Sequence, residues 1–327
     1  SEHSMVHPTL YITRLLPEPV MAILRERYAL VSEPVEDQIP TDEDQRRGFS
    51  QADAVICTLA DPITDDLLAA APRLKIVANY AVGYNNIDVA AATRRGIIVT
   101  NTPDVLTDAT ADLTWALMLA GARRVVAGDR WSRSGQWPGW APTQMLGTDV
   151  TGKTLGIIGM GRIGQAVALR AQGFRMPVLY ASRRPCSAPT GVTTWTHRPL
   201  EEVLTQADFI SLHVPLSEAT RHLIGSRELA MMKSTAFLIN TSRGPVIDEA
   251  ALLAALRKGT IAGAGLDVYE REPLITAGLE TLPNVVLLPH LGSATQQVRI
   301  KMGMLCVENI AAVLGGRPPL NPVNRQD

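Results

Sequence analysis

The sequence TLGIIGMGRIG, Thr154–Gly164, determines how the rest of the chain is interpreted. Its apolar run leads into Gly159, Gly161 and Gly164, and a helical pattern follows over Gln165–Gln172. Strand, glycine-rich turn and helix in this order are the fingerprint of a dinucleotide-binding unit, whose helix N-terminus faces a pyrophosphate. A glycine-rich bend without a ligand is the alternative, and the flanking strand and helix argue against it. The fingerprint supplies the first predicted cofactor-binding residues: Gly159, Met160, Gly161, Arg162, Ile163 and Gly164.

The next strand bears on which dinucleotide is bound. Val178–Ala181 is predicted to be this strand, and it ends about twenty residues past the first glycine, where an acidic side chain holds the ribose 2′-hydroxyl of NAD. Ser182, Arg183 and Arg184 stand there instead. Two guanidinium groups and a hydroxyl suit a 2′-phosphate, although a pair of solvated arginines is the alternative. We therefore expect NADPH to be preferred, with NADH possible.

Composition narrows the classes of partner. The 327 residues are enough for two domains, and 31 Lys+Arg against 32 Asp+Glu give a net charge of −1. This balance predicts no attraction to nucleic acid or to anionic membranes, so a small diffusible ligand is expected. No apolar run is long enough to span a membrane. Three separated cysteines without metal-ligand spacing predict no metal site and a reduced, cytoplasmic protein: Cys57, Cys186 and Cys306.

Short apolar runs alternate with helical patterns, which predicts an α/β fold of two Rossmann-like, doubly wound parallel sheets with a cleft between them. The first series of expected strands is Leu10–Thr13, Ala54–Thr58, Lys75–Asn79 and Ile97–Thr100. A long helical pattern over Leu106–Ser134 follows, and then a loop rich in tryptophan, glycine and proline over Gly135–Asp149. The second series is Thr154–Ile158, Val178–Ala181, Phe209–Val214, Ala236–Asn240, Ala264–Val268 and Val285–Leu288.

The last helical pattern, Ala294–Leu314, is long enough to return to the first domain. We therefore expect that domain to be discontinuous. The predicted boundaries are 5–103 with 292–327 for a substrate-binding domain, and 104–291 for a dinucleotide-binding domain.

Polar residues that follow the strands of the second series are candidates for chemistry, because ligands bind outside the carboxyl ends of parallel strands. Arg243 follows one strand and could bind a carboxylate with its planar fork. His290 follows another, where an imidazole can donate or accept a proton near neutral pH. Glu272 lies between them and could favour the protonated imidazole. Taken alone, each of these three residues is more typical of a surface ion pair or a loop hydrogen bond. Their shared position after strands of one nucleotide-binding sheet supports a chemical role for all three.

Four motifs in order resemble the D-isomer-specific 2-hydroxyacid dehydrogenase family. They are the fingerprint, Asn240–Gly244 (NTSRG), Gly265–Pro273 (GLDVYEREP) and Pro289–Thr295 (PHLGSAT). The similarity extends from about Leu10 to Val323, and it is greatest to the glyoxylate/hydroxypyruvate reductases, including the 2-ketogluconate reductase branch.

The resemblance implies roles for individual residues. Arg243 would bind the substrate carboxylate and carbonyl, His290 would be the acid/base, and Glu272 would pair with His290. The amides of Val82 and Gly83 would hold the substrate carboxylate. Ser293 would also line the substrate site. Further positions that match the cofactor site are Thr110, His213, Pro215, Thr241, Ser242 and Asp267. Homodimerisation is also a family expectation.

Two departures from the family pattern bear on specificity. The ribose-binding acid is replaced by Ser182, Arg183 and Arg184, as in NADPH-preferring reductases. Trp140 is kept in the loop before the coenzyme domain, whereas Gln144 stands where several glyoxylate reductases carry a second tryptophan. The resemblance then implies room for a longer 2-keto acid.

The predicted activity is NADPH-dependent reduction of a small 2-keto acid to the D-2-hydroxy acid, with His290 as the proton donor. Glyoxylate, hydroxypyruvate and 2-ketogluconate are the candidate substrates. Formate oxidation is disfavoured because those enzymes carry Gln where Glu272 stands. Phosphite oxidation uses a similar set of Arg, Glu and His and stays open. A non-catalytic, dinucleotide-sensing protein of the corepressor type is the alternative from another class.

Overall fold

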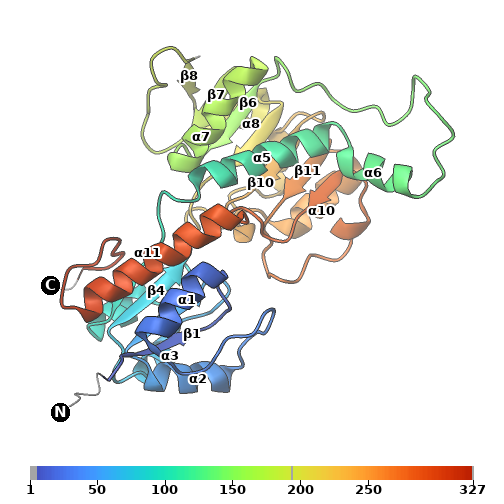
Figure 1. The fold of residues 1–327 in the computed structure, drawn as a ribbon. Coiled ribbons are helices and arrows are strands. Elements are labelled where there is room, and N and C mark those ends of the chain that lie inside the picture. The colour runs from blue at the N-terminus through green and yellow to red at the C-terminus, as the bar shows by residue number, and fades with distance from the viewer. Residues whose placement is uncertain (1–5, 193, 326–327) are drawn as a thin grey trace. The chain divides into compact units, whose positions relative to one another are not determined.

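The computed structural model describes residues 6–192 and 194–325. The chain divides into two compact units: unit 1 is Ser1–Leu106 with Ser293–Asp327, and unit 2 is Thr107–Gly292. Residues 5, 326 and 327 of the predicted substrate-binding domain lie outside the described residues. Each unit contains one parallel sheet with helices on both faces, which confirms the predicted α/β class (Figure 1).

Unit 1 contains a five-stranded sheet in the order β2-β1-β3-β4-β5, with every neighbouring pair parallel. Chain order reverses beside β1, because β1 pairs with β2 on one side and β3 on the other. The strands are β1 Thr9–Ile12, β2 Ala29–Leu30, β3 Ala54–Thr58, β4 Ile76–Tyr80 and β5 Ile98–Thr100.

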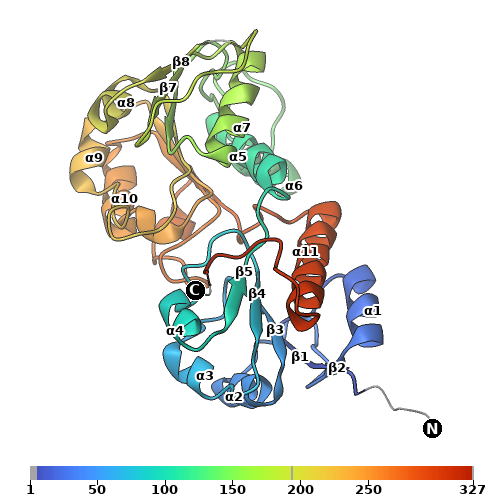
Figure 2. The same cartoon turned by 90° about the vertical axis from the view of Figure 1, so that its left-hand side faces the viewer.

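Helices cover both faces of this sheet. Figure 2 shows α1 and α11 on one face and α2, α3 and α4 on the other. The terminal helix α11 belongs to unit 1 and packs closely on α1, where a Cβ on Gly303 would stand 2.5 Å from Val20 Cγ2. The helices are α1 Glu18–Arg27, α2 Asp42–Gln51, α3 Asp65–Ala69, α4 Val89–Arg94 and α11 Gln296–Leu314.

Unit 2 contains a seven-stranded sheet in the order β12-β11-β10-β9-β6-β7-β8, again parallel throughout. Every residue of β6, β9, β10 and β11 is buried, as expected for strands covered on both faces. The strands are β6 Leu155–Ile158, β7 Val178–Ala181, β8 Trp195–His197, β9 Phe209–Leu212, β10 Phe237–Asn240, β11 Gly263–Leu266 and β12 Val285–Leu287.

Two apolar layers sandwich this sheet. One forms with α5 and α7, the other with α8, α9 and α10 (Figure 2). The ends of α10 follow from sequence: Asp248 accepts a hydrogen bond from the Ala251 amide, and Gly259 ends the helix with φ 71°. The helices are α5 Thr107–Ala122, α6 Val125–Arg133, α7 Arg162–Ala171, α8 Leu200–Gln206, α9 Ser226–Met231 and α10 Glu249–Lys258, with short 3-10 turns η1 Gln172–Phe174, η2 Gly244–Val246 and η3 Leu279–Thr281.

The prediction of one helix over Leu106–Ser134 was wrong. The chain forms α5 and α6, and Arg124 between them has a left-handed backbone with φ 54°. The carbonyl of Ala122, which a continuous helix would pair with a later amide, instead accepts a hydrogen bond from Thr148 N at 2.8 Å. The returning loop therefore ends α5.

No helix within residues 6–192 and 194–325 is long and apolar enough to cross a membrane.

Candidate active site

Three neighbouring strands of unit 2 present the predicted catalytic side chains at their carboxyl ends. Arg243 follows β10, Glu272 lies on the loop after β11, and His290 follows β12. Because these strands are adjacent and parallel, their carboxyl ends lie at one edge of the sheet. The structure thus brings together residues that are 47 positions apart in the chain, from Arg243 to His290.

His290 and Glu272 are in direct contact through their side chains. Nδ1 of His290 lies 2.8 Å from Oε2 of Glu272, and the side chains are 22% and 31% exposed. Burial raises the pKa of Glu272, but the hydrogen bond and charge of His290, the Tyr269 amide and Arg243 outweigh it. The pKa of Glu272 is therefore lower than usual. Because Glu272 is paired with Nδ1, the other ring nitrogen of His290, Nε2, is left for another partner.

Asp267 holds the backbone that follows His290. Its carboxylate oxygens accept the amides of Leu291 at 2.6 Å and Gly292 at 2.9 Å. His290 itself has φ 57°, a conformation that non-glycine residues adopt at a cost of about 1–3 kcal/mol. Burial raises the pKa of Asp267, although the two amides and the charge of His290 oppose this. Asp267 therefore fixes a strained turn that orients the imidazole.

Arg243 is positioned by a close contact between two loops. A Cβ on Gly244 would lie 1.9 Å from the Tyr269 carbonyl carbon, so only glycine fits between the loops after β10 and β11. The side chain of Asn240 donates to the Arg243 carbonyl at 3.0 Å. Burial lowers the pKa of Arg243, and the charge of Glu272 opposes this. Because an arginine side chain loses its proton only far above physiological pH, the guanidinium still stays cationic beside the His290–Glu272 pair.

The turn after β6 suits a dinucleotide pyrophosphate. Gly159 has φ 93°, and a Cβ there would lie 2.5 Å from the His213 carbonyl oxygen. At Gly161 the space for a Cβ is open, and α7 begins one residue later. At Gly164 a Cβ would lie 2.1 Å from the Gly159 carbonyl oxygen. The backbone can therefore approach an anion at the N-terminus of α7, around Met160, Arg162 and Ile163.

Threonines of α5 connect this helix to two strand ends. Thr110 Oγ1 donates to the Gly292 carbonyl at 3.1 Å, and Thr114 Oγ1 lies 2.9 Å from Thr241 Oγ1. Ser242 Oγ donates to Asn240 Oδ1 at 2.7 Å. Thr110, Thr241 and Ser242 are therefore parts of the scaffold on this side of the sheet.

His213 and Pro215 follow β9, the strand beside β6. His213 Nε2 lies 2.7 Å from Ser211 Oγ, and burial lowers the pKa of His213 to about 3. This imidazole is thus neutral at physiological pH. The Pro215 carbonyl accepts a hydrogen bond from Thr220 Oγ1 at 2.6 Å.

The two arginines after β7 extend into solvent. Arg183 and Arg184 are exposed, while Ser182 Oγ donates to the Arg184 carbonyl at 2.6 Å. The Ser182 carbonyl lies 3.0 Å from His197 Nε2 of the edge strand β8. The backbone at this strand end is therefore fixed, while both guanidinium groups are accessible to a ligand.

Val82 and Gly83 belong to unit 1, on the loop after β4. Asn101 Nδ2 donates to the Val82 carbonyl and Asn79 Nδ2 donates to the Gly83 carbonyl, both at 2.9 Å. Within residues 6–192 and 194–325, no hydrogen bond from the amides of Val82 or Gly83 is found. The loop is thus held by its carbonyls, and its amides can receive an anion.

Ser293, the remaining predicted substrate residue, also lies in unit 1, and its Oγ accepts a hydrogen bond from Arg299 Nε at 3.0 Å.

Sequence reasoning missed the residues that position this machinery. Asn79 and Asn101 were not predicted, although both stand at strand ends next to the Val82–Gly83 loop. Asp267 was predicted to contact the cofactor. Its hydrogen bonds to the turn after His290 were not predicted from the sequence. The signal for Asn79 was the group of three asparagines in Asn79–Asn86, because asparagine side chains often bond to nearby backbone groups; Asn101 had no such signal.

This arrangement is suited to carbonyl reduction by a bound dinucleotide. The cationic fork could hold an anionic substrate, the imidazole could supply a proton, and the glycine-rich turn could hold the dinucleotide, which would supply the hydride.

Comparison with known proteins agrees with this chemistry. Residues 115–292 match the family model described as D-isomer specific 2-hydroxyacid dehydrogenase, NAD binding domain. The chain is 49% identical to a glyoxylate reductase of Thermococcus gammatolerans over 323 residues, 98% of this chain and 96% of that protein. It is 48% identical to a glyoxylate reductase of Pyrococcus furiosus, again over 98% of this chain and 96% of that protein.

Solved structures are similar over almost the full length. An NADPH-dependent glyoxylate/hydroxypyruvate reductase of Sinorhizobium meliloti, in complex with NADP and malonate, superposes with a TM-score of 0.84 at 35% identity, covering 97% of each chain. A Thermus thermophilus protein superposes with a TM-score of 0.90 at 45% identity, covering 97% of this chain and 100% of that one.

Proposed function

Because the chain belongs to the D-isomer-specific 2-hydroxyacid dehydrogenase family, we propose that it reduces glyoxylate and related small 2-keto acids, using NADPH. As a member of this family it is an oxidoreductase. Relatives named glyoxylate reductase support glyoxylate as a substrate. The Sinorhizobium meliloti protein supports hydroxypyruvate and NADPH. In this proposal unit 2 binds the dinucleotide and unit 1 contributes to substrate binding.

The contact between His290 and Glu272 carries the proposal. It lies at the sheet edge that also bears Arg243, and it leaves Nε2 of His290 for the substrate. A protein that only senses a dinucleotide has no need for a paired proton donor beside a cationic fork. This pair therefore favours catalysis over the corepressor-type alternative.

Each side chain has a distinct task in the reduction. Arg243 binds the carboxylate of the 2-keto acid and orients its carbonyl. A bound nicotinamide dinucleotide supplies the hydride. His290 delivers a proton from Nε2 to the carbonyl oxygen, while Glu272 stabilises the imidazolium before transfer. Because negative charge grows on that oxygen, the positive charges of Arg243 and His290 stabilise the transition state more than the ground state.

Substrate and cofactor preference are tested by initial rates at neutral pH. Glyoxylate, hydroxypyruvate and 2-ketogluconate are each offered with NADPH and with NADH, and loss of nicotinamide absorbance is followed. We expect turnover with NADPH to exceed turnover with NADH for at least one acid. If no acid is reduced while both cofactors bind, the reductase proposal is wrong, and phosphite oxidation with NADP⁺ is assayed next.

The NADPH preference is attributed to Arg183 and Arg184, whose guanidinium groups are exposed at the end of β7. Replacing both by alanine removes charge-assisted hydrogen bonds of about 1.5–3 kcal/mol each, so the KM for NADPH should rise at least about tenfold. The KM for NADH should hardly change. Arg227→Ala, another exposed arginine of unit 2, is the control. Equal losses with both cofactors would contradict the assignment.

Three further expectations belong to the proposal. The amides of Val82 and Gly83 receive the substrate carboxylate, and Ser293 lines the substrate site. The protein acts as a cytoplasmic homodimer. Sedimentation equilibrium of the purified chain tests the dimer.

A further inference from the structure

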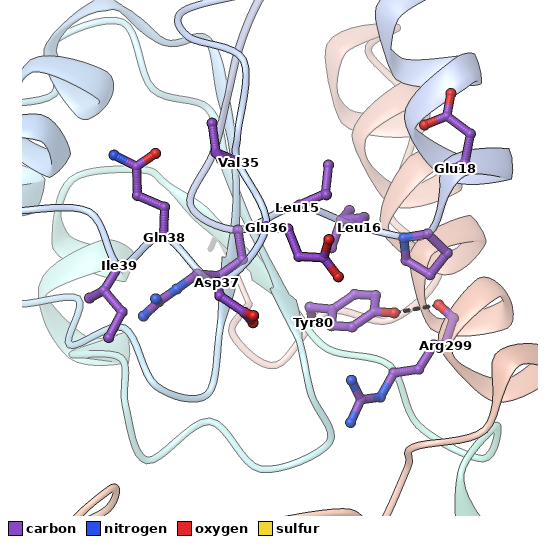
Figure 3. A pocket seen from close by; sticks show the side chains of 12 residues that line it. Leu15, Leu16, Glu18, Val35, Glu36, Asp37, Gln38, Ile39, Tyr80 and Arg299 are labelled. Carbon is purple, nitrogen blue, oxygen red and sulfur yellow. Dashed lines mark hydrogen bonds between the residues drawn. The ribbon is translucent and has the colours of Figure 1, made fainter.

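Unit 1 contains a cavity at the carboxyl edge of its sheet, apart from the residues assigned a role above. It has a volume of about 720 Å³, within the range of about 300–1,000 Å³ typical of small-molecule sites. The loops after β1 and β2 line it, together with Tyr80 at the end of β4 and Arg299 of α11 (Figure 3). Chain order in this sheet reverses beside β1, and open parallel sheets bind ligands at such points.

Arg299 provides the free cation of this cavity. Its Nε donates to Ser293 Oγ at 3.0 Å, and its carbonyl accepts a hydrogen bond from the Tyr80 hydroxyl. For the other two guanidinium nitrogens, no partner is found within the described part of the chain. Arg14 also lines the cavity, but its charge is compensated by Asp61, which is fully buried and 3.0 Å away. Arg299 is therefore oriented by its Nε and can still bind a carboxylate with its outer nitrogens.

Two carboxylates supply the opposite charge. Glu36 and Asp37 lie on the loop after β2, and neither side chain has an ion pair or hydrogen bond among the described residues. In the view of Figure 3, the Glu36 carboxylate and the Arg299 guanidinium lie on opposite sides of the Tyr80 ring. The third acid at the rim, Glu18, is paired with Arg25 at 2.8 Å.

Apolar side chains complete the lining. Leu15, Val35 and Ile39 are 38%, 57% and 69% exposed, an unusual concentration of large apolar groups around a single cavity. Such surface gains free energy when a ligand covers it, by about 25 cal/mol per Å².

We propose that this cavity binds an α-amino acid with an apolar side chain. A simple anion would be attracted by Arg299 but repelled by Glu36 and Asp37. A simple cation would be attracted by the two acids but repelled by Arg299. A zwitterion satisfies both, with its carboxylate on Arg299 and its ammonium on the two acids. Its apolar side chain then covers Leu15, Val35 and Ile39. None of these ligand contacts uses Arg243, Glu272 or His290, although Arg299 also donates a hydrogen bond to Ser293 of the proposed substrate site.

Calorimetric titration of the full chain with L-leucine and D-leucine tests the proposal. We expect one of them to bind, and leucinamide, which lacks the carboxylate, to bind at least tenfold more weakly. The double variant Glu36→Gln with Asp37→Asn should weaken leucine binding at least tenfold. Asn suits the left-handed backbone of position 37, where φ is 56°, so the fold should be kept.

The matched control is Glu43→Gln, an exposed acid of α2 outside the cavity, which should bind leucine like the parent chain. Thermal melting of each variant checks that the fold is intact. The proposal is wrong if neither leucine binds, if leucinamide binds as tightly, or if the double variant binds leucine unchanged. The last result would place leucine at another carboxylate site, such as Arg243.

Discussion

The carboxyl edge of the large sheet and the loop after β4 in the small sheet are built by opposite means. At the large sheet, side chains act: His290 pairs with Glu272 at 2.8 Å, and Asp267 fixes the turn beside them. At the small sheet, side chains of Asn79 and Asn101 hold two carbonyls, and the backbone amides of Val82 and Gly83 have no hydrogen-bond partner among the described residues. In the proposed reaction, side-chain identity would decide function in the first region, and backbone geometry would decide it in the second.

This difference predicts how each region responds to substitution. Removing a reacting side chain removes a chemical step, whereas removing a scaffold side chain changes the position of a group that is still present. Losses of turnover are therefore expected at the large sheet, and losses of substrate affinity at the small one.

His290→Ala should have the largest effect. Loss of a general acid costs about 10²–10⁴ in rate, so kcat with glyoxylate should fall at least about a hundredfold. Cofactor affinity, measured by nicotinamide fluorescence, should change little because the fingerprint turn is untouched. Turnover close to normal would show that the side chain is not the proton donor, and the contrast between the two regions would fail.

Gly244→Ala should have the second-largest effect. The new Cβ would lie 1.9 Å from the Tyr269 carbonyl carbon, so one loop must shift and displace Arg243 or Glu272. We expect a loss of about 1–3 kcal/mol in urea unfolding and reduced kcat. Gly173→Ala is the control, since its Cβ meets nothing within 4 Å. Equal stability of both variants would mean that the loops are not in close contact.

Asn101→Ala tests the backbone region. It removes the 2.9 Å hydrogen bond to the Val82 carbonyl, worth about 1 kcal/mol, so the KM for the keto acid should rise about fivefold while kcat changes less. Gln51→Ala, on the surface of α2 in the same unit, serves as the control. A fall in kcat at constant KM would assign this loop to catalysis rather than to binding.

Glu272→Gln should have the smallest effect on stability, visible as a pH dependence of unfolding. Because the folded pKa of Glu272 lies below its ordinary value of about 4.3, ionisation favours the folded state above that pH. The wild type should therefore be more stable than the variant near neutrality, by less than about 1 kcal/mol at this partly exposed site. The difference should vanish as the pH falls through the folded pKa. A difference that grows in acid would contradict the pairing.

Sequence patterns predicted the fold, and they predicted that Arg243, Glu272 and His290 follow strands of one sheet, because both depend on local composition. Buried strands appear as apolar runs, and polar residues that follow such runs lie at one sheet edge. Helices and strands that contain no apolar run were not predicted. The strand β2 has only two residues, and α2, DEDQRRGFSQ, is polar except at Gly48 and Phe49.

Features that depend on long-range contacts could not be predicted. The break after α5 arises because Thr148 takes the Ala122 carbonyl, a contact 26 residues away that leaves no periodic signal. The left-handed turn at His290 depends in the same way on Asp267, 23 residues earlier in the chain. The hydrogen bonds from Asn79 and Asn101 that hold the Val82–Gly83 loop also join residues that no local pattern connects.

The return of the chain to unit 1 through α11 has a consequence for the order of folding during synthesis. The sheet of unit 1 is translated early, but one of its faces is covered by α1 and α11, and α11 emerges after all of unit 2. The ribosome therefore releases a complete unit 2 while unit 1 still exposes apolar surface. The side of the unit 1 sheet that α11 covers therefore stays open until translation has passed Leu314, and such transiently exposed apolar surface is prone to aggregation.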